Sequence, residues 1–186
     1  MTKILNIIGS VCSGKSTLAS GLFYQFKSNG HSVELIHETI PKTSSYLQDK
    51  LTIGVQPYIF GDVLYRIELL NNKVDYIINE CPLVLSYIYN TKYPFSFNEA
   101  VLDIAEMFDN IYLYTRPMHD YIDVGRLHSK EESADINASI LFLLNRLDKF
   151  NEPLYNISGV SPQEIYTAFI ELRLSEYAFS EWDFEL

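Results

Sequence analysis

The chain has few cysteines, few basic residues and no long apolar run, and each of these shortages argues against certain classes of protein. Its 186 residues include two cysteines, Cys12 and Cys81, which lack metal-ligand spacing. No secretory leader pattern occurs, so we expect reduced thiols and a cytoplasmic protein. No apolar run approaches the ~20 residues that span a bilayer, and no membrane partner is expected.

Positive charge is scarce. The chain has 14 Lys and Arg residues against 24 Asp and Glu, for a net charge of −10. Such a surface repels nucleic acid, so nucleic-acid binding is disfavoured, although a local basic pocket is still allowed. The hydrophobic fraction is 47% and the charged fraction 20%, ordinary values for a globular domain with a core. The length then predicts a single domain over residues 1–186.

Segments typical of strands and of helices alternate along the chain. Buried strands are predicted at residues 3–8, 32–37, 74–80, 110–116 and 153–158. Helices are predicted at residues 15–28, 56–72, 82–90 and 97–108, after Ser129 and after Ser161, with a shorter one within 41–50. Ser129 and Glu132 match a capping box, and Pro162 suits the first position of the last helix. The alternation predicts an α/β fold, in which helices cover both faces of a parallel sheet in three layers.

The stretch GSVCSGKST, residues 9–17, separates the first strand from the first helix. It contains Gly9-x4-Gly14-Lys15-Ser16, which matches the phosphate-loop pattern without a mismatch. Glycines let the backbone curl and aim N–H groups at one point, and the following helix adds the positive end of its dipole. The loop predicts binding of ATP with Mg²⁺, in which Lys15 reaches the β- and γ-phosphates and Ser16 ligates the metal ion. The residues expected to bind the nucleotide are Gly9, Ser13, Gly14, Lys15, Ser16 and Thr17.

Two carboxylates end later strands and would reach the same edge of the sheet, where ligands bind in such folds. Glu80 ends the segment IINE and is predicted to hold Mg²⁺ or its water; the alternative is a solvated acid at a strand end. Glu38, in HETIPK, is predicted to accept the proton of an attacking hydroxyl. It could equally bind a substrate hydroxyl, or stand at the N-terminus of a helix before Pro41.

Basic side chains gather after the fourth strand, in the stretch TRPMHDYIDVGRLHSKEE. Phosphoryl transfer requires cations around the charge of the transferred group. We therefore predict a lid at about residues 117–130, with Arg116 and Arg126 in catalytic roles; the alternative is a solvated polar loop. On the helix predicted after the second strand, Gln56 and Arg66 are the expected contacts with the acceptor.

A resemblance to a known family is carried by four stretches, GSVCSGKST, HETIPK, NECPLVLSYIYN and YTRPMHDYIDVGRLHSKEE. Together they resemble a small P-loop kinase of the nucleoside and nucleotide kinase type. They are most similar to phage-encoded kinase-like ATPases related to the nicotinamide riboside kinase domain, and more loosely to deoxynucleoside kinases. The resemblance covers residues 3–160. It implies a P-loop NTPase fold with a five-stranded parallel sheet in the order 2-3-1-4-5 and a short lid.

The same resemblance implies ATP–Mg²⁺ as the phosphoryl donor and an acceptor that meets the LSYIY segment. Many relatives carry Asp where Glu80 stands, so we expect Glu80 to contact the metal through water. The tail SEYAFSEWDFEL matches no pattern of the family and can be a packed helix end or the contact of a homodimer.

The activity implied is an ATP-dependent phosphotransferase that acts on a nucleoside, a nucleotide or a related small acceptor. Two alternatives stay open. One is a kinase acting on hydroxymethyluracil in DNA, which the acidic surface disfavours. The other is a regulatory nucleotide-binding ATPase that transfers no phosphoryl group to an acceptor.

Overall fold

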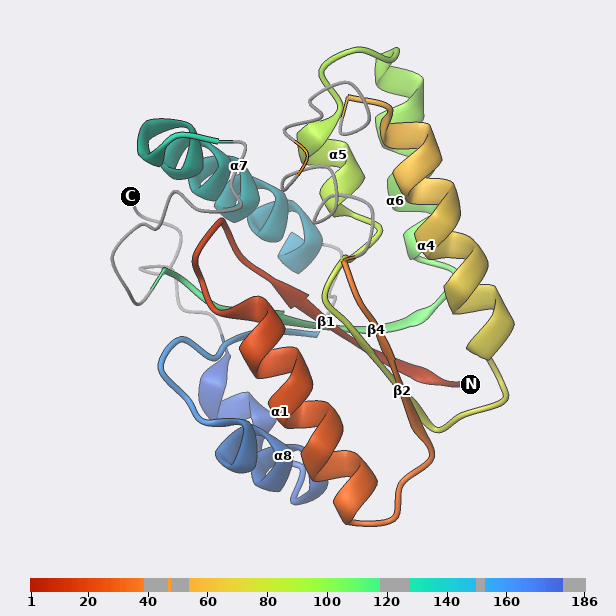
Figure 1. The fold of residues 1–186 in the computed structure, drawn as a ribbon, viewed down its shortest axis with the longest axis vertical. Helices are drawn as coiled ribbons and strands as arrows, with labels where there is room; N and C mark the ends of the chain where they lie inside the picture. Colours follow the sequence, from red (N-terminus) through yellow and green to blue (C-terminus); the bar gives the residue numbers. More distant parts are fainter. Residues whose placement is uncertain (39–46, 48–53, 118–127, 150–152, 179–186) are drawn as a thin grey trace.

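The computed structural model describes residues 1–38, 47, 54–117, 128–149 and 153–178. Their strands are β1 (Lys3–Ile8), β2 (Val33–Ile36), β3 (Tyr76–Asn79), β4 (Asp109–Tyr114) and β5 (Leu154–Asn156). Each neighbouring pair is parallel, and the order is β2-β3-β1-β4-β5, which confirms the predicted arrangement. β1 therefore lies at the centre, and the loop that follows it leaves the middle of the carboxyl edge (Figure 1).

Helices cover both faces of this sheet (Figure 1). One face carries α1 (Lys15–Ser28), α8 (Pro162–Ile170) and the 3₁₀-helix η1 (Leu174–Tyr177); the other carries α4 (Gln56–Leu70), α5 (Leu85–Tyr89), α6 (Phe95–Ala105) and α7 (Lys130–Lys149). Each outer layer buries its own apolar cluster, with Leu22 and Phe26 in one and Ile67 and Leu144 in the other. The fold is the predicted three-layer sandwich.

Local sequence fixes two helix starts as expected. At the start of α7, the Ser129 N–H donates to Glu132 Oε2 (2.7 Å) and the Glu132 N–H donates to Ser129 Oγ (3.2 Å). At the start of α8, Ser161 and Glu164 form the same reciprocal pair, and Pro162 is the first helical residue. Both capping boxes satisfy N–H groups that a helix start leaves without partners.

Some boundaries differ from those predicted. The helix expected at 82–90 begins only at Leu85, because residues 82–86 first form a tighter turn in which the Leu85 N–H bonds to the Pro82 carbonyl. The helix expected at 97–108 begins at Phe95, directly after Pro94, and ends at Ala105, where a turn leads into β4. The short helix expected within 41–50 falls almost entirely outside the described residues.

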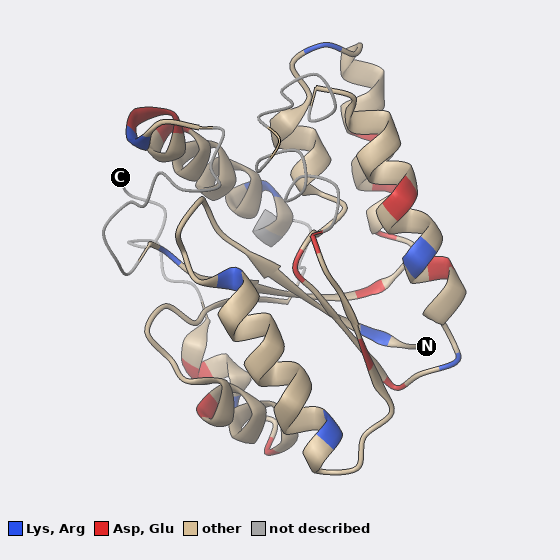
Figure 2. Cartoon of the chain, in the orientation of Figure 1, with Lys and Arg blue, Asp and Glu red and all other residues tan. Residues whose placement is uncertain are grey.

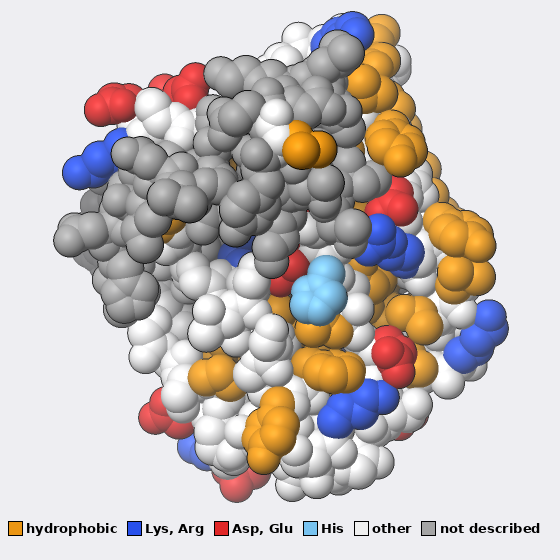
Figure 3. Space-filling model, in the orientation of Figure 1, with side chains coloured by type: hydrophobic (Ala, Val, Ile, Leu, Met, Phe, Trp, Pro, Cys, Tyr) orange, Lys and Arg blue, Asp and Glu red, His pale blue; other side chains and the backbone are white. Residues whose placement is uncertain are grey.

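The surface of the described part is mixed in charge. Figure 2 shows acidic and basic residues scattered over the ribbon, without a basic stripe on the described elements in this view. α4 exposes Tyr58, Tyr65 and Leu69, and Figure 3 shows hydrophobic side chains along the side of the molecule where α4 runs. Among the described residues, no helix combines the length and apolar character needed to cross a membrane.

Candidate active site

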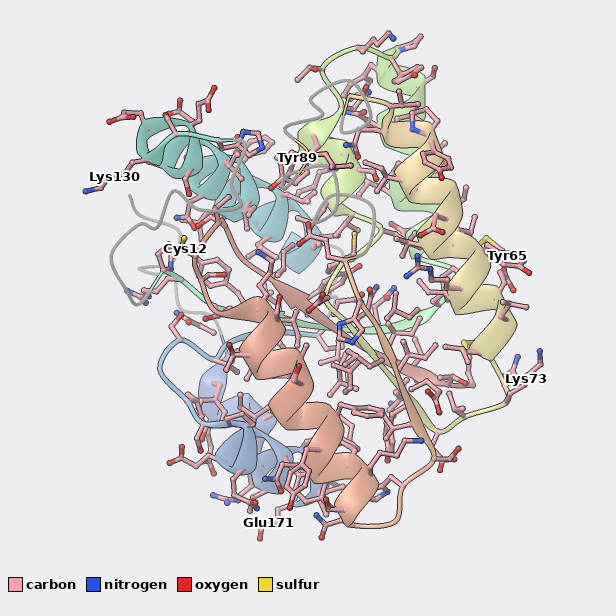
Figure 4. All side chains as sticks on the ribbon, viewed as in Figure 1. Cys12, Tyr65, Lys73, Tyr89, Lys130 and Glu171 are labelled. Carbon is pink, nitrogen blue, oxygen red and sulfur yellow. The ribbon has the colours of Figure 1, made fainter. Side chains whose placement is uncertain are left out.

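A cavity opens at the carboxyl edge of the sheet, and five separate parts of the chain line it. They are residues 11–17 after β1, Glu38 after β2, the first two turns of α4, the segment from Cys81 to Tyr89, and His128. Figure 4 labels two of these residues, Cys12 on the loop after β1 and Tyr89 on α5, on opposite sides of this region. Ligands of open parallel sheets bind at this edge.

The loop after β1 is a tight curl that ends at the start of α1. Gly14 has φ of +81° and Cys12 has φ of +63°, so two residues adopt the left-handed conformation within this short stretch. A Cβ on Gly9 would collide with the Thr115 carbonyl oxygen and come within 2.6 Å of Ser13 Oγ. Thr115, just beyond β4, also donates through Oγ1 to the Ser13 carbonyl (3.1 Å). Glycine at position 9 is thus required by the neighbouring strand end.

Lys15 lies over the same loop. Its Nζ donates to the carbonyl oxygens of Gly9 and Ser10, both at 3.0 Å, and its side chain lines the cavity. The hydroxyls of Ser10 and Ser13 are buried and have no hydrogen-bond partner among the described residues. The cationic amine of Lys15 and Ser13, whose hydroxyl lacks a partner in the described part of the chain, therefore lie at the part of the cavity where an anion would be held.

The first turn of α1 supplies further donors. Its N-cap is Gly14, with no side-chain cap and no acidic residue in the first turn. Ser16 and Thr17, in that turn, line the cavity. The uncapped N–H groups and the positive end of the helix dipole attract an anion at this point.

Glu38 and Glu80 lie at the same edge of the sheet, as predicted, and contact each other there, but their surroundings differ. Glu80 is 1% exposed and does not line the cavity; its Oε1 accepts the Glu38 N–H (2.8 Å) and lies 3.3 Å from His37 Nδ1. Its Oε2 is buried without a partner among the described residues. Glu38 itself lines the cavity. The buried carboxylate of Glu80 therefore fixes the backbone of Glu38, and the Glu38 residue lines the cavity.

Glu38 affects the pKa values of two neighbouring side chains, Cys81 and Tyr89. Burial, with the Glu38 charge as the second cause, raises the pKa of the Cys81 thiol well above its ordinary value. The same two causes, in the same order, raise the pKa of the Tyr89 phenol. Both groups are therefore neutral at physiological pH, and both lie close enough to Glu38 to sense its charge.

The far wall of the cavity is mostly apolar. α4 contributes Gln56, Ile59, Phe60 and Val63, which share one face of the helix. Leu83, Leu85, Ser86 and Tyr89 come from the segment after β3, so the structure places LSYIY at the cavity as the resemblance implied. The ring of His128 stacks on that of Tyr89, with 6.0 Å between centroids and an interplanar angle of 30°. The sequence analysis did not single out Phe60 or His128.

Neither Arg66 nor Arg116 is among the residues that line the cavity. Arg66 pairs with Asp62 (2.7 Å) and donates to the His37 carbonyl (3.2 Å), and it is absent from the cavity lining. In this structure Arg66 therefore contacts Asp62 and the His37 carbonyl, and its contact with the acceptor stays a prediction. Arg116 is exposed at the end of β4, and its backbone N–H donates to Ser158 Oγ (3.0 Å). Arg126 and most of the predicted lid lie outside the described residues.

A magnesium ion fits this donor set. Among the described residues no three His, Cys, Asp or Glu side chains form a metal-holding cluster. Mg²⁺ commonly takes one or two protein oxygens and completes its shell with water and phosphates. Ser16 at the cavity and the unpartnered Oε2 of Glu80 are oxygens of the required kind.

The sheet order, the glycine-dependent loop and the helix that follows it define the class: a three-layer α/β/α P-loop NTPase fold. Neither a protein-family model nor a curated protein sequence matches the chain. Solved structures do match. Deoxyadenosine kinase from M. mycoides with bound dATP is 17% identical, with a TM-score of 0.52, over 93% of this chain and 98% of its own.

Thymidylate kinase from Candida albicans is 13% identical, with a TM-score of 0.58, over 94% of this chain and 92% of its own. A second structure of the M. mycoides deoxyadenosine kinase, with the products dCMP and a flexible dCDP bound, matches equally well, at a TM-score of 0.52. At these identities the likeness concerns the fold, which the chain shares over nearly its whole length.

Proposed function

We propose that the chain is an ATP-dependent kinase that transfers the γ-phosphoryl group to a small nucleoside-like acceptor. One observation carries the proposal: the phosphate loop, the Glu38 carboxylate and a mostly apolar wall with one amide, Gln56, line a single cavity. The structural neighbours support it, since both are kinases by name and one is seen with dATP and with dCMP and dCDP. The fold alone would not choose this activity.

The donor half binds the triphosphate through backbone and charge. The N–H groups of the loop and of the first turn of α1 hold phosphate oxygens, and Lys15 moves from the loop carbonyls to the β- and γ-phosphates. Ser16, and Glu80 through water, would hold Mg²⁺, which would supply positive charge to neutralise the transferred group. Lys15 stabilises the same charge as it builds up in the transition state.

The acceptor half orients the nucleophile. The acceptor hydroxyl oxygen forms a bond to the γ-phosphorus while the bond from that phosphorus to the β,γ-bridging oxygen breaks, and ADP leaves. Glu38 accepts the hydroxyl proton or fixes the hydroxyl by a hydrogen bond. Gln56 is buried at the cavity wall and offers an amide to a base edge, and Phe60 and Tyr89 offer aromatic surface to its plane. Arg116 and Arg126 remain proposed contacts of the transferred phosphoryl group.

The test is transfer itself. The protein is incubated with ATP, Mg²⁺ and a panel of nucleosides, nucleotides and nicotinamide riboside, and ADP is measured. We expect ADP formation that depends on the acceptor. ADP released only with DNA containing hydroxymethyluracil, or tight ATP binding without any transfer, would contradict the proposal and favour one of the two alternatives.

Lys15→Ala tests the donor half. It should lower kcat by about 100- to 1,000-fold, the usual loss when a group that stabilises transition-state charge is removed. The matched control is Lys27→Ala, at the other end of α1, where the lysine pairs on the surface with Glu34 (3.0 Å). Steady-state rates and thermal unfolding are measured for both variants. Equal rates for Lys15→Ala and the wild type would contradict the assigned role of the loop.

Glu38→Gln tests the acceptor half. As a general base, Glu38 should contribute about 100-fold or more to kcat, with little change in the KM of the acceptor. As a hydroxyl-binding residue it should mainly set that KM. Glu34→Gln, on the preceding strand and outside the cavity, is the matched control. Unchanged kcat and KM in Glu38→Gln would remove Glu38 from the mechanism.

Three further properties are part of the proposal. They are the kinship with phage-encoded kinase-like ATPases and the nicotinamide riboside kinase domain, a cytoplasmic location, and a homodimer. Light scattering at several protein concentrations decides the last of these.

A further inference from the structure

Three asparagines lie buried in the middle of the sheet, on three neighbouring strands. Asn79 Nδ2 on β3 donates to Asn6 Oδ1 on β1 (3.0 Å), and Asn6 Nδ2 donates to Asn110 Oδ1 on β4 (2.8 Å). Asn110 Nδ2 in turn donates to the Ala105 carbonyl (2.7 Å), at the end of α6. We call Asn6, Asn79 and Asn110 the amide ladder. Side chains alternate along a strand, so the ladder shares the sheet face of Ile4, Ile77 and Tyr112, which belong to the core under α4 to α7.

Such a ladder is costly in a core. A buried amide loses its hydrogen bonds to water, and this cost is offset only if its polar atoms are paired within the protein. An apolar residue of similar size has no such desolvation cost. At Asn79, the hydrogen bonds of the amide ladder continue out of the core to the backbone of the turn after β3. Asn79 is 0% exposed, and its Oδ1 accepts the backbone N–H of Cys81 (3.1 Å). The ladder therefore ends on the turn that leaves β3, at the carboxyl edge of the sheet.

That turn carries Glu80 between the two bonded positions. Glu80 Oε1 accepts the Glu38 N–H at 2.8 Å. The hydrogen bonds thus run from the centre of the sheet through Asn79 to the turn at residues 79–81, and from Glu80 to the backbone of Glu38, whose side chain lines the cavity. Neither Asn79 nor Glu80 lines the cavity.

We propose that Asn79 is a positioning residue, which fixes the turn after β3 and, through Glu80, holds Glu38 against the acceptor. The inference rests on the proposed function, in which Glu38 meets the acceptor hydroxyl. A displacement of about 1 Å in a catalytic group can cost roughly 100-fold in rate, so a buried amide that holds this turn affects turnover without touching the substrate. The competing explanation is that the ladder only stabilises the pairing of β1, β3 and β4.

The structure offers a matched control at the other end of the same strands. Thr2 is 2% exposed; its Oγ1 donates to the Val74 carbonyl (2.6 Å) and accepts the Asn72 N–H (2.8 Å). It thus ties the start of β1 to the segment before β3 with two hydrogen bonds, at the edge away from the cavity. Thr2→Val removes both bonds and keeps the shape of the side chain.

Two variants of Asn79 separate its two bonds. Asn79→Ala loses both the bond to Asn6 and the acceptor for the Cys81 N–H. Asn79→Ser keeps a hydroxyl oxygen that can accept the N–H two residues ahead, as serine does in turns, and it serves as the milder variant should Asn79→Ala fold poorly. Each variant and Thr2→Val is measured for melting temperature, for kcat and acceptor KM at a temperature where it is fully folded, and for ATP affinity.

A second readout does not depend on any activity. Hydrogen exchange at the backbone amides of Cys81 and Glu38 reports whether the turn and Glu38 are held. In Asn79→Ala we expect protection at both amides to fall about tenfold or more, as for one lost hydrogen bond, and kcat to fall about 10- to 100-fold with ATP affinity unchanged. Asn79→Ser should keep most of the protection and rate, and Thr2→Val should lose stability while keeping both.

Two results overturn the proposal. One is protection at the Glu38 and Cys81 amides that is unchanged in folded Asn79→Ala. If that variant does not fold, a fall in the kcat of Asn79→Ser with both amides still protected has the same force, because the rate would then depend on Asn79 by a route other than the turn. The other is a rate loss in Thr2→Val as large as in the Asn79 variants at equal loss of stability, which would make the ladder purely structural. A wild-type protein that transfers no phosphoryl group contradicts the proposed function instead, and the exchange measurement then still decides whether Asn79 holds Glu38.

Discussion

The two halves of the cavity are built in different ways. The half proposed to bind phosphate, here called the phosphate half, is lined by one continuous stretch, residues 11–17, which contains the left-handed residues Cys12 and Gly14. The acceptor half is assembled from Glu38, one face of α4, the segment after β3 and His128, which are far apart in the chain. A phosphate can be held by backbone alone, whereas a base and a sugar need side chains of particular shape.

This difference determines what a substitution does on each side. In the phosphate half, the proposed binding groups are backbone N–H groups, whose positions determine whether ATP binds. An added methyl group that displaces this backbone should therefore weaken ATP binding as much as the loss of a charge. In the acceptor half, side chains provide the contacts, so exchanging one that lines the cavity removes that contact and leaves the phosphate loop unchanged. A substitution that moves the phosphate loop should therefore abolish ATP binding, and a substitution in the acceptor half should change acceptor recognition alone.

The largest effect is expected from Gly9→Ala. The new Cβ would collide with the Thr115 carbonyl oxygen and crowd Ser13 Oγ, so the loop must move away from the end of β4. Overpacking of this kind costs about 1–3 kcal/mol in the free energy of unfolding, and the displaced loop should no longer bind ATP measurably. Calorimetric titration with ATP and thermal unfolding provide the two measurements.

The matched control is Gly61→Ala, in the middle of α4. A Cβ there meets nothing within 4 Å, and alanine is the better helix former by roughly 0.5–1 kcal/mol. This variant should be more stable than the wild type and bind ATP normally. Normal ATP affinity in Gly9→Ala would show that the phosphate half tolerates a moved backbone, and the contrast between the two halves would fail.

A smaller and more selective effect is expected from Gln56→Leu. Gln56 is buried at the cavity wall, and loss of its amide removes a hydrogen bond to the acceptor, worth about 1–3 kcal/mol when the partner is left unpaired. The acceptor KM should rise about 10- to 100-fold with the affinity for ATP unchanged. Steady-state kinetics with each substrate varied in turn measure both values.

Gln163→Leu is the matched control, because it makes the same change near the start of α8, where the glutamine amide bonds to Thr167 Oγ1 (3.2 Å) on the surface. Its kinetics should equal those of the wild type. If Gln56→Leu weakened ATP binding as much as acceptor binding, the two halves would not be separable.

The same difference between the two halves explains which features of the fold and of the site could be predicted from the sequence. Period-2 and period-3.6 patterns predicted the strands, the helices and the three layers, because these depend on which residues face a core. The sheet order followed from the resemblance to small P-loop kinases. Of the two capping boxes, the sequence predicted the one formed by Ser129 and Glu132. The phosphate loop was found to the residue, because its glycines must stand at set positions in the chain. Lys15 and Ser16 follow from the same local constraint, and the structure places both at the cavity.

The acceptor wall could not be found in this way. Ile59, Phe60 and Val63 follow the spacing of a core face, and no sequence pattern distinguishes a face that packs on a core from one that lines a cavity. Arg66 was chosen for its charge, but its position on α4 directs it to Asp62 and the His37 carbonyl. The contact between Tyr89 and His128 joins residues 39 positions apart and depends on the fold.

The smallest effect is expected behind the phosphate half, at the start of α8, which packs against α1. Ser161 Oγ accepts the Glu164 N–H (3.3 Å) and pairs with Glu164 Oε2 (2.6 Å). Loss of such a cap in Ser161→Ala should lower the melting temperature by about 2–4 °C at pH 7. The kinetic constants should not change, because no atom of the cap lies in the cavity.

The pH dependence of this difference follows from the carboxylate. The Ser161 hydroxyl, and then its backbone N–H, lower the pKa of Glu164 from its ordinary value of 4.5. A lowered folded-state pKa contributes stability that is present above 4.5 and is lost as the pH falls through the folded value. The difference in melting temperature should therefore be complete at pH 7 and shrink below about pH 4.5. It should not vanish, since the hydroxyl still accepts the Glu164 N–H. A difference that grew on acidification would contradict the assigned effect of Ser161 on the pKa of Glu164. A change in kcat at pH 7 would show that α8 is coupled to the loop through α1.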